Sequence, residues 1–239
     1  FGILTLDLSN NRLTELGKYL FRSLRNVHEI KLSHNKLSTL ERSLFKGLNK
    51  LSELSIDNNE LRLIRRKTFA DLIGLEFIRL ENNRIETIEP GAFRNLSSLK
   101  LIDLENNILE TLAEGVFIGL PNLKEIKLSR NRIRSLHERV FADLNNLEQI
   151  SLTKNKLQRL EPQLFTGLRR LNELYLENNE LGSLENDTFV DLVNLEFLKI
   201  NFNRIENIEK FAFRGLVNLN ILDLSNNSLK NLSNGVFGQ

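Results

Sequence analysis

Apolar and polar positions follow one another along this chain in a pattern that returns every 24 residues. Each unit reads LxxLxLxxNxLxxLxxxxFxxL, with Ile or Val in place of Leu at some positions. The "LxL" part, for example Ile126-Lys127-Leu128, has a period of two and predicts a short strand with one buried face. Ser, Gly, Asp or Asn lies between the Phe of a unit and the Leu that follows it, which predicts a tight irregular return rather than a long helix.

Two side chains mark the repeating unit without exception. Asn and Phe each recur at every 24th position, with no gap and no insertion. The Asn positions are Asn11, Asn35, Asn59, Asn83, Asn107, Asn131, Asn155, Asn179, Asn203 and Asn227. The Phe positions are Phe21, Phe45, Phe69, Phe93, Phe117, Phe141, Phe165, Phe189, Phe213 and Phe237. Residues 1–239 are therefore predicted to form a single solenoid of ten units.

A single unit holds too few apolar side chains for a core, so the units have to stack and bury their Leu positions against one another. The strands then join into a parallel sheet, which at ~4.8 Å per strand spans roughly 45 Å. We expect all ten Asn amides to be buried at the turns, bonded to backbone groups. A polar binding ladder is the less favoured interpretation of the Asn positions. The Phe rings are expected to form a stacked apolar spine.

This pattern resembles the leucine-rich repeat in its typical 24-residue form, known from Toll-like receptor ectodomains, Slit and the variable lymphocyte receptors. The resemblance implies an α/β solenoid, a horseshoe with a concave parallel β-sheet and a mostly irregular or 3-10 convex side. Extracellular members usually carry Cys-rich caps, and this chain has no Cys. We therefore expect a repeat-region fragment without terminal caps, in which Ile3, Leu6, Leu8 and Phe237 are more exposed than the equivalent residues of middle units.

A second, longer period of 120 residues is superimposed on the 24-residue period. Phe77 recurs as Phe197, Thr68 recurs as Thr188, and the motif NRIExIE occurs at both 83–89 and 203–209. We infer that a block of five units was duplicated. Chance convergence within a limited set of residue types is the alternative.

Positions six, four and two residues before each Asn should point outward onto the concave face. Most of these positions are charged or small and polar, but apolar exceptions cluster in two places. The predicted ligand-binding residues are Phe77 and Leu101 in the first cluster, and Tyr175, Phe197, Phe202 and Ile221 with Lys199 in the second. Exposed aromatic side chains rimmed by charge are common at protein interfaces. The alternative is that Phe77 and Phe197 merely pack against neighbouring side chains.

The composition adds little other chemistry. A net charge of +2 is too small to argue for a nucleic acid partner, so none is expected, and no apolar run approaches a membrane span. Three His without aligned acids or Cys predict no metal site, and no phosphate loop or nucleophile elbow is present. We expect no catalytic residue, no cofactor and no enzyme activity. Lys31, Lys127, Arg130 and Lys154 form a weaker basic set that is interpreted as solvated surface.

The sequence also bears on compartment and function. Sequons at Asn95, Asn186, Asn226 and Asn231 are glycosylation candidates that fit secretion, although a chain this rich in Asn contains several by chance. The favoured function is protein recognition by an extracellular segment of a receptor, an adhesion molecule or a secreted binding protein. The alternatives are a structural scaffold or matrix spacer without a dedicated ligand, and a bacterial or intracellular repeat protein.

Overall fold

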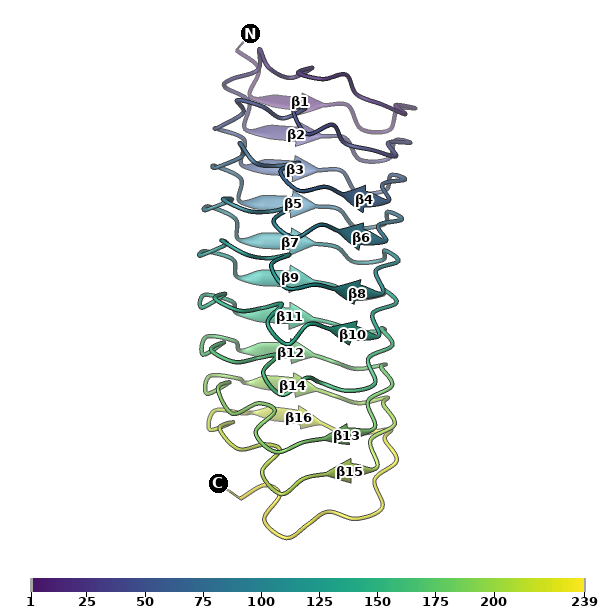
Figure 1. Cartoon of the computed structure of the whole chain (residues 1–239), viewed down its shortest axis with the longest axis vertical. Coiled ribbons are helices and arrows are strands. Elements are labelled where there is room, and N and C mark those ends of the chain that lie inside the picture. Colours follow the sequence, from purple (N-terminus) through teal and green to yellow (C-terminus); the bar gives the residue numbers. More distant parts are fainter. Residues whose placement is uncertain (1, 239) are drawn as a thin grey trace.

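The computed structural model describes residues 2–238. Ten strands of three residues form one parallel sheet, in the order in which the chain reaches them (Figure 1). Their bounds are β1 (Thr5–Asp7), β2 (Glu29–Lys31), β3 (Glu53–Ser55), β5 (Phe77–Arg79), β7 (Leu101–Asp103), β9 (Glu125–Lys127), β11 (Gln149–Ser151), β12 (Glu173–Tyr175), β14 (Phe197–Lys199) and β16 (Ile221–Asp223). Neighbouring strands pair at a separation of 24 residues, as Thr5 does with Glu29. The sequence offset between paired residues therefore equals the length of one repeat.

Burial along each strand follows the predicted period of two. In β9, Ile126 is fully buried, whereas Glu125 and Lys127 on either side of it are half-buried and lie on the opposite face. The end strands β1 and β16 are more exposed, because each has a neighbouring strand on one side only within the described chain. The outward residues of all ten strands form one continuous surface, which we call the concave face.

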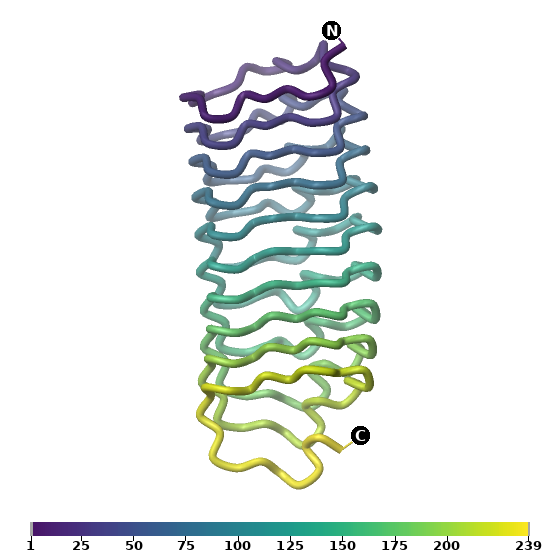
Figure 2. The backbone as a smooth tube through the Cα atoms, turned by 180° about the vertical axis from the view of Figure 1, so that it is seen from behind, coloured from purple at the N-terminus to yellow at the C-terminus, as the bar shows by residue number. Residues whose placement is uncertain are grey.

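The chain returns from one strand to the next through turns, and successive units coil without an insertion (Figure 2). Three parallel pairs of two-residue strands lie on the return path: β4 (Leu63–Ile64) with β6 (Thr87–Ile88), β8 (Thr111–Leu112) with β10 (Ser135–Leu136), and β13 (Ser183–Leu184) with β15 (Asn207–Ile208). Residues 2–238 contain no helix. Backbone bonds between residues three apart, such as Leu24 N to Phe21 O at 2.9 Å, close single turns on the convex side, as the turn-forming residues predicted.

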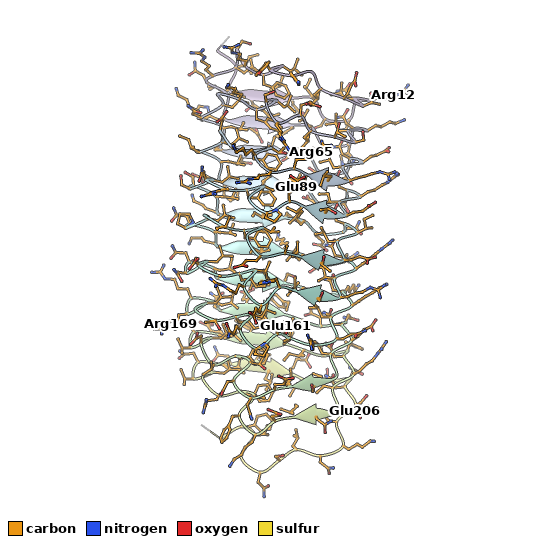
Figure 3. All side chains as sticks on the ribbon, in the orientation of Figure 1. Arg12, Arg65, Glu89, Glu161, Arg169 and Glu206 are labelled. Atoms are coloured by element: carbon orange, nitrogen blue, oxygen red, sulfur yellow. The ribbon has the colours of Figure 1, made fainter. Side chains whose placement is uncertain are left out.

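The Phe residues form the expected spine. The ring centroids of successive units lie between 5.7 and 6.4 Å apart, in stacked orientation. Figure 3 shows charged side chains such as Arg12, Arg169 and Glu206 projecting from the outside of the stack, away from this core. Burial of the spine fails only at one end, where Phe237 is 61% exposed. Ile3, Leu6 and Leu8 are likewise only partly buried, as expected for a unit with one neighbour.

The Asn side chains tie each unit to the one before it. Asn131 donates from Nδ2 to the carbonyl oxygens of Leu128 at 3.1 Å and Ser129 at 3.3 Å within its own turn. It also donates to Leu104 O at 3.0 Å, and its Oδ1 accepts from the Leu109 backbone N–H at 3.1 Å, both in the preceding unit. The amide is saturated by backbone, which leaves the binding-ladder interpretation without support.

The expectation that all ten Asn residues are buried is wrong at the two ends. Eight of them are buried, but Asn11 is exposed and Asn227 is half-buried. Asn11 reaches only Leu8 O and Ser9 O of its own turn, because residues 2–238 place no earlier unit beside it. Asn227 makes the full set of bonds backward, but within the same residues no later unit covers it. Burial of this side chain therefore requires a neighbour on both sides.

Candidate protein-binding face

The second cluster predicted from the sequence is brought together by the sheet register. Phe197 pairs with Ile221 on one side and with Glu173 on the other. In the next row, Lys199 lies between Tyr175 and Asp223. Phe202 lies in the turn just after β14. We call Tyr175, Phe197, Phe202 and Ile221 the C-terminal patch. Its members come from three adjacent units, so only the stacked fold places them on neighbouring strands and on the turn after β14.

The exposure of this patch lies between that of a core and that of a solvated surface. Phe202 is 52% exposed and Ile221 is 45% exposed, whereas Phe197 and Tyr175 are half-buried. Phe197 therefore packs against its neighbours while part of its surface stays open to solvent, which is compatible with either interpretation of this residue. Side chains that are preordered by packing and still exposed are suited to docking.

Tyr175 is held in place by two polar contacts. Its hydroxyl donates a hydrogen bond of 2.7 Å to Glu173 Oε2, and Lys199 Nζ lies 5.6 Å from its ring centroid. Burial, followed by the hydrogen bond to Glu173, raises the pKa of Tyr175 to about 12. The ring is thus a neutral, oriented surface next to a cation. Sequence reasoning had grouped Tyr175 with Lys199 but had not foreseen the contact with Glu173.

Phe202 occupies a backbone position that suits another residue type. Its φ is 54°, in the left-handed region, and the same position has positive φ in every unit. The residues there are Asn10, His34, Asn58, Asn82, Asn106, Arg130, Lys154, Asn178, Phe202 and Asn226. Asn tolerates this conformation, whereas a bulky side chain is disfavoured in it. An exposed Phe at a strained position gains little for folding, so its presence points to a use outside the fold.

Phe77 and Leu101 form the N-terminal patch. They pair directly across β5 and β7, and both are half-buried. Arg79, two residues after Phe77, forms an ion pair with Glu53 at 3.5 Å on the neighbouring strand. This patch has no counterpart of Phe202 or Tyr175, because Asn82 and Ser55 stand at those places. It is therefore smaller and more polar than the C-terminal patch.

An acidic surface beside the N-terminal patch was missed by the sequence reasoning. Burial, followed by repulsion from Asp103 and Asp57, raises the pKa of Glu81 to about 7. Glu81 and Glu105 lie on successive units in the column two residues before the Asn, with Asp57 one unit earlier. Three acids in adjacent units of one column were visible in the sequence. Their effect on the pKa of Glu81 depends on how far the side chain is buried, and the sequence does not report burial.

The basic set behaves as solvated surface. Lys31 pairs with Glu29 at 3.0 Å, and Lys127 lies 3.4 Å from Glu125. Arg130 pairs with Glu105 at 3.2 Å. These pairs join exposed or half-exposed side chains along and across the strands, where each contributes little to stability. Lys154 lies in the left-handed turn position that Phe202 occupies two units later.

The four sequon Asn residues are all exposed. Asn186 differs from the rest, because its Oδ1 accepts a 2.8 Å hydrogen bond from Phe211 N and the buried Thr188 hydroxyl donates to Glu185 O. Asn226 occupies the turn position next to Phe202, whose N–H donates to Ser225 O at 3.0 Å. A glycan on Asn226 would therefore lie against the C-terminal patch, whereas Asn95 lies in a turn of the return path.

Other chemistry on the described part of the chain is sparse. Within residues 2–238 no three His, Cys, Asp or Glu side chains gather as a metal site would require. No helix in those residues is long and apolar enough to cross a membrane. A hollow of 640 Å³ borders the C-terminal patch where its strands begin, lined by polar residues that include Asn172, Glu196 and Asn220.

Stacked parallel strands, an Asn ladder, a Phe spine and an open outward face define a solenoid repeat protein with a broad recognition surface. The chain belongs to the leucine-rich repeat family: the family model described as "Leucine rich repeat" matches residues 3–61, 49–109, 97–157, 146–205 and 198–239. No curated protein sequence matches the chain.

Solved structures of receptor-type repeats share this architecture. A structure of FLRT2 with Latrophilin 3 and Unc5D is 30% identical with a TM-score of 0.85, covering 99% of this chain and 72% of that chain. Mouse RP105 in complex with MD-1 is 28% identical with a TM-score of 0.82, covering 94% and 38%. TLR13 in complex with single-stranded RNA is 25% identical with a TM-score of 0.72, covering 96% and 36%. The present chain thus spans little more than a third of the last two proteins.

Proposed function

We propose that this chain recognises a protein ligand through its concave face, with the C-terminal patch as the main contact. The observation that carries the proposal is Phe202, a 52% exposed Phe at φ 54° in the turn that follows the strand of Phe197. Interface hot spots are enriched in aromatic side chains that cluster at the centre of a contact. The FLRT2 and RP105 structures are of complexes with protein partners, which supports the same use of this fold here.

A protein partner fits this face better than a nucleic acid. Carboxylates line the surface around both patches, with Glu53 and Asp57 beside the first and Glu173 and Glu177 beside the second. RNA would bring phosphates against these groups, and its affinity depends on basic side chains. The RNA named in the TLR13 structure therefore does not carry over to this surface.

We further propose that the chain works outside the cell, as part of a receptor, an adhesion molecule or a secreted binding protein. The resemblance to Toll-like receptor ectodomains and the exposed sequons support this compartment. A scaffold without a dedicated ligand is the rival function. A scaffold gains nothing from Phe at position 202, where Asn would be easier to accommodate. The two functions therefore differ in whether the C-terminal patch contacts a ligand.

The test measures binding of the full chain to an array of purified secreted and cell-surface ectodomains by biolayer interferometry. Three versions are compared: the wild type, Phe197→Ala, and Gln149→Ala as a matched control in the same column, on a strand that carries no member of either patch. Phe197→Ala should weaken binding of a bound ectodomain by about 2 kcal/mol, close to thirtyfold. Gln149→Ala should leave binding unchanged.

Circular dichroism melting of the same variants separates binding from folding. The proposal expects Phe197→Ala to lose far more affinity than stability. A patch that serves only packing would show the reverse, with a lower Tm and full affinity for every bound ectodomain. A failure of all ectodomains to bind would favour the scaffold function.

A further inference from the structure

The structure repeats itself at 120 residues in details that the 24-residue unit does not require. The accessory pair β4 and β6 recurs 120 residues later as β13 and β15. Arg66 N donates to Glu89 Oε2 at 2.7 Å, and Asn186 N donates to Glu209 Oε2 at the same distance. Figure 3 labels Glu89 on the first of these return segments.

Two further pairs of contacts repeat at the same interval. The hydroxyl of Thr68 donates to the carbonyl oxygen of Arg65 at 2.9 Å, and that of Thr188 donates to the carbonyl oxygen of Glu185 at 2.8 Å. Both threonines are buried. The ion pair of Arg84 with Glu60 recurs as that of Arg204 with Glu180. Positions 120 residues apart thus agree in hydrogen bonds and ion pairs as well as in residue type, which favours duplication of a block of five units over chance convergence.

The duplicated block carries a surface motif as well as a framework. On the concave face, Glu53, Phe77 and Leu101 lie side by side on β3, β5 and β7. Glu173, Phe197 and Ile221 lie in the same arrangement on β12, β14 and β16. The row beside each triplet holds a cation followed by an acid, Arg79 and Asp103 in the first case and Lys199 and Asp223 in the second.

Both motifs also contain a buried hydrogen-bond acceptor that lacks a donor. Glu81 Oε2 and Asn201 Oδ1 are buried atoms at positions 120 residues apart, and neither has a hydrogen-bond partner among residues 2–238. Glu177 Oε2, in the unit before that of Asn201, shares this state. Buried polar atoms without partners are costly, so the shared state of Glu81 and Asn201 is a further detail in which the two motifs agree.

Both motifs carry an excess of negative charge. Carboxylates outnumber cations around Phe77, where the acids are Glu53, Asp57, Glu81, Asp103 and Glu105 and the cations paired with them are Arg79, Lys127 and Arg130. Around Phe197, Glu173, Glu177 and Asp223 face Lys199. An apolar pair within an acidic surface is complementary to a basic segment that carries a bulky apolar anchor.

We propose that the concave face holds two equivalent docking sites, centred on Phe77–Leu101 and Phe197–Ile221, for a partner that presents the same basic, apolar-anchored segment twice. This inference rests on the proposed function and adds the number of sites and the chemistry of the ligand. The two Phe residues lie five strands apart along the sheet, which at 4.8 Å per strand is about 24 Å. A dimeric or tandem-repeat partner can span that distance and gain affinity from engaging both sites.

The two sites should differ in strength and in salt dependence. The C-terminal site adds the rings of Tyr175 and Phe202, where the N-terminal site has Ser55 and Asn82. The N-terminal site adds the carboxylate of Glu105 and, above about pH 7, that of Glu81, where the C-terminal site has Ser225 and Asn201. Screening by salt weakens exposed charge pairs more than apolar contacts, so binding at the N-terminal site should fall more steeply as salt rises.

The experiment uses a phage-displayed library of random twelve-residue peptides against the full chain with one site disabled. Phe77→Ala leaves the C-terminal site, Phe197→Ala leaves the N-terminal site, and the double variant leaves neither. Peptides enriched on Phe77→Ala and absent from the double variant should be basic with one apolar anchor. They should also bind Phe197→Ala within about tenfold, and calorimetry on the wild type should show two peptides per chain.

A tandem peptide then tests bivalency. Two copies of an enriched sequence joined by about 20 Gly/Ser residues reach a mean span of about 25 Å. The tandem should bind the wild type about 100-fold more tightly than the single peptide, and either single variant should abolish the gain. Gln149→Ala, between the sites, should keep it. Melting of all variants by circular dichroism identifies any that fail to fold.

Two outcomes overturn the inference in different ways. If each site enriches peptides that the other does not bind, or if the wild type binds one peptide, the two sites are not equivalent, while the proposed function survives. If no enriched peptide depends on Phe77 or Phe197, both the inference and the proposed function fail. Enrichment of acidic peptides would likewise contradict the assigned ligand chemistry.

Discussion

Asn131 Nδ2 donates to the carbonyl oxygen of Leu104, 27 residues earlier, across the boundary between two units at 3.0 Å. The Oδ1 of the same side chain accepts a hydrogen bond from the Leu109 backbone N–H, so one amide satisfies backbone groups of two units. Removal of the amide leaves buried carbonyl and N–H groups unsatisfied, each at a cost of about 1–3 kcal/mol. We expect Asn131→Ala to lower the free energy of unfolding by about 3 kcal/mol or more, measured by urea unfolding with circular dichroism.

Asn11→Ala is the matched control for that measurement. Asn11 is exposed and bonds only to Leu8 O and Ser9 O of its own turn. Its loss should cost less than about 1 kcal/mol, because water can replace the amide at an exposed site. Equal losses from the two variants would show that the interunit bonds contribute nothing extra.

Gly215 is required by both its conformation and its surroundings. Its φ is 94°, and a Cβ there would lie 2.1 Å from Val190 O. Gly215→Ala should therefore destabilise the chain by more than about 2 kcal/mol, since the left-handed conformation alone costs roughly 1–2 kcal/mol. At Gly182, by contrast, no heavy atom of residues 2–238 outside its chain neighbours lies within 4 Å of the place that a Cβ would take. Gly182→Ala should leave the unfolding midpoint unchanged or raise it, and an equally large loss there would remove the steric explanation.

Glu81 should make stability depend on pH near neutrality. Burial raises its pKa in the folded chain to about 7, whereas an unfolded Glu titrates near 4.5. As pH rises from about 4.5 to about 7, the unfolded state loses its proton first, so the folded state is progressively destabilised by this group. Glu81→Gln removes the cost. The Tm of the variant relative to wild type should rise across this window and level off above about pH 8.

Glu86→Gln controls for the loss of a surface charge, because Glu86 is exposed on a return segment. Its Tm difference from wild type should stay flat across the same pH range. A flat difference for Glu81→Gln as well would mean that the carboxylate is solvated in solution and carries no strain.

We expect Phe202 to lower the stability of the fold and to raise the affinity for a ligand. Phe202→Asn places the residue that six other units use at a position with φ 54°. We expect the free energy of unfolding to rise by about 1 kcal/mol, because Asn tolerates the left-handed conformation better than Phe. Affinity for any ectodomain or peptide that binds the C-terminal patch should fall in the same variant. The readouts are urea unfolding and interferometry.

Asn178→Phe supplies the reciprocal control. Asn178 is exposed at the same turn position one unit earlier, with φ 58°. The substitution should cost about as much stability as Phe202→Asn gains. If Phe202→Asn destabilises the chain, the ring of Phe202 is part of the framework and the argument for its external use is withdrawn.

The sequence by itself determined the features that every unit must share. Asn131 and Phe141 recur with a fixed step because each stacked unit has to present the same amide and the same ring to its neighbour. The alternation around Ile126 was also legible, since a strand turns successive side chains to opposite faces. Even the grouping of Phe197 with Ile221 followed from column arithmetic, because the register equals the repeat length.

Only the tertiary structure decided what differs between one unit and another. The left-handed backbone under Phe202, the bond from Tyr175 to Glu173, and the burial that holds a proton on Glu81 near neutral pH all depend on the environment of a single side chain. The exposure of Asn11, in contrast to Asn131, depends on whether a preceding unit lies beside it. A repeat pattern reports what is common to all units, whereas burial, electrostatic repulsion and backbone strain arise from what surrounds each residue in space.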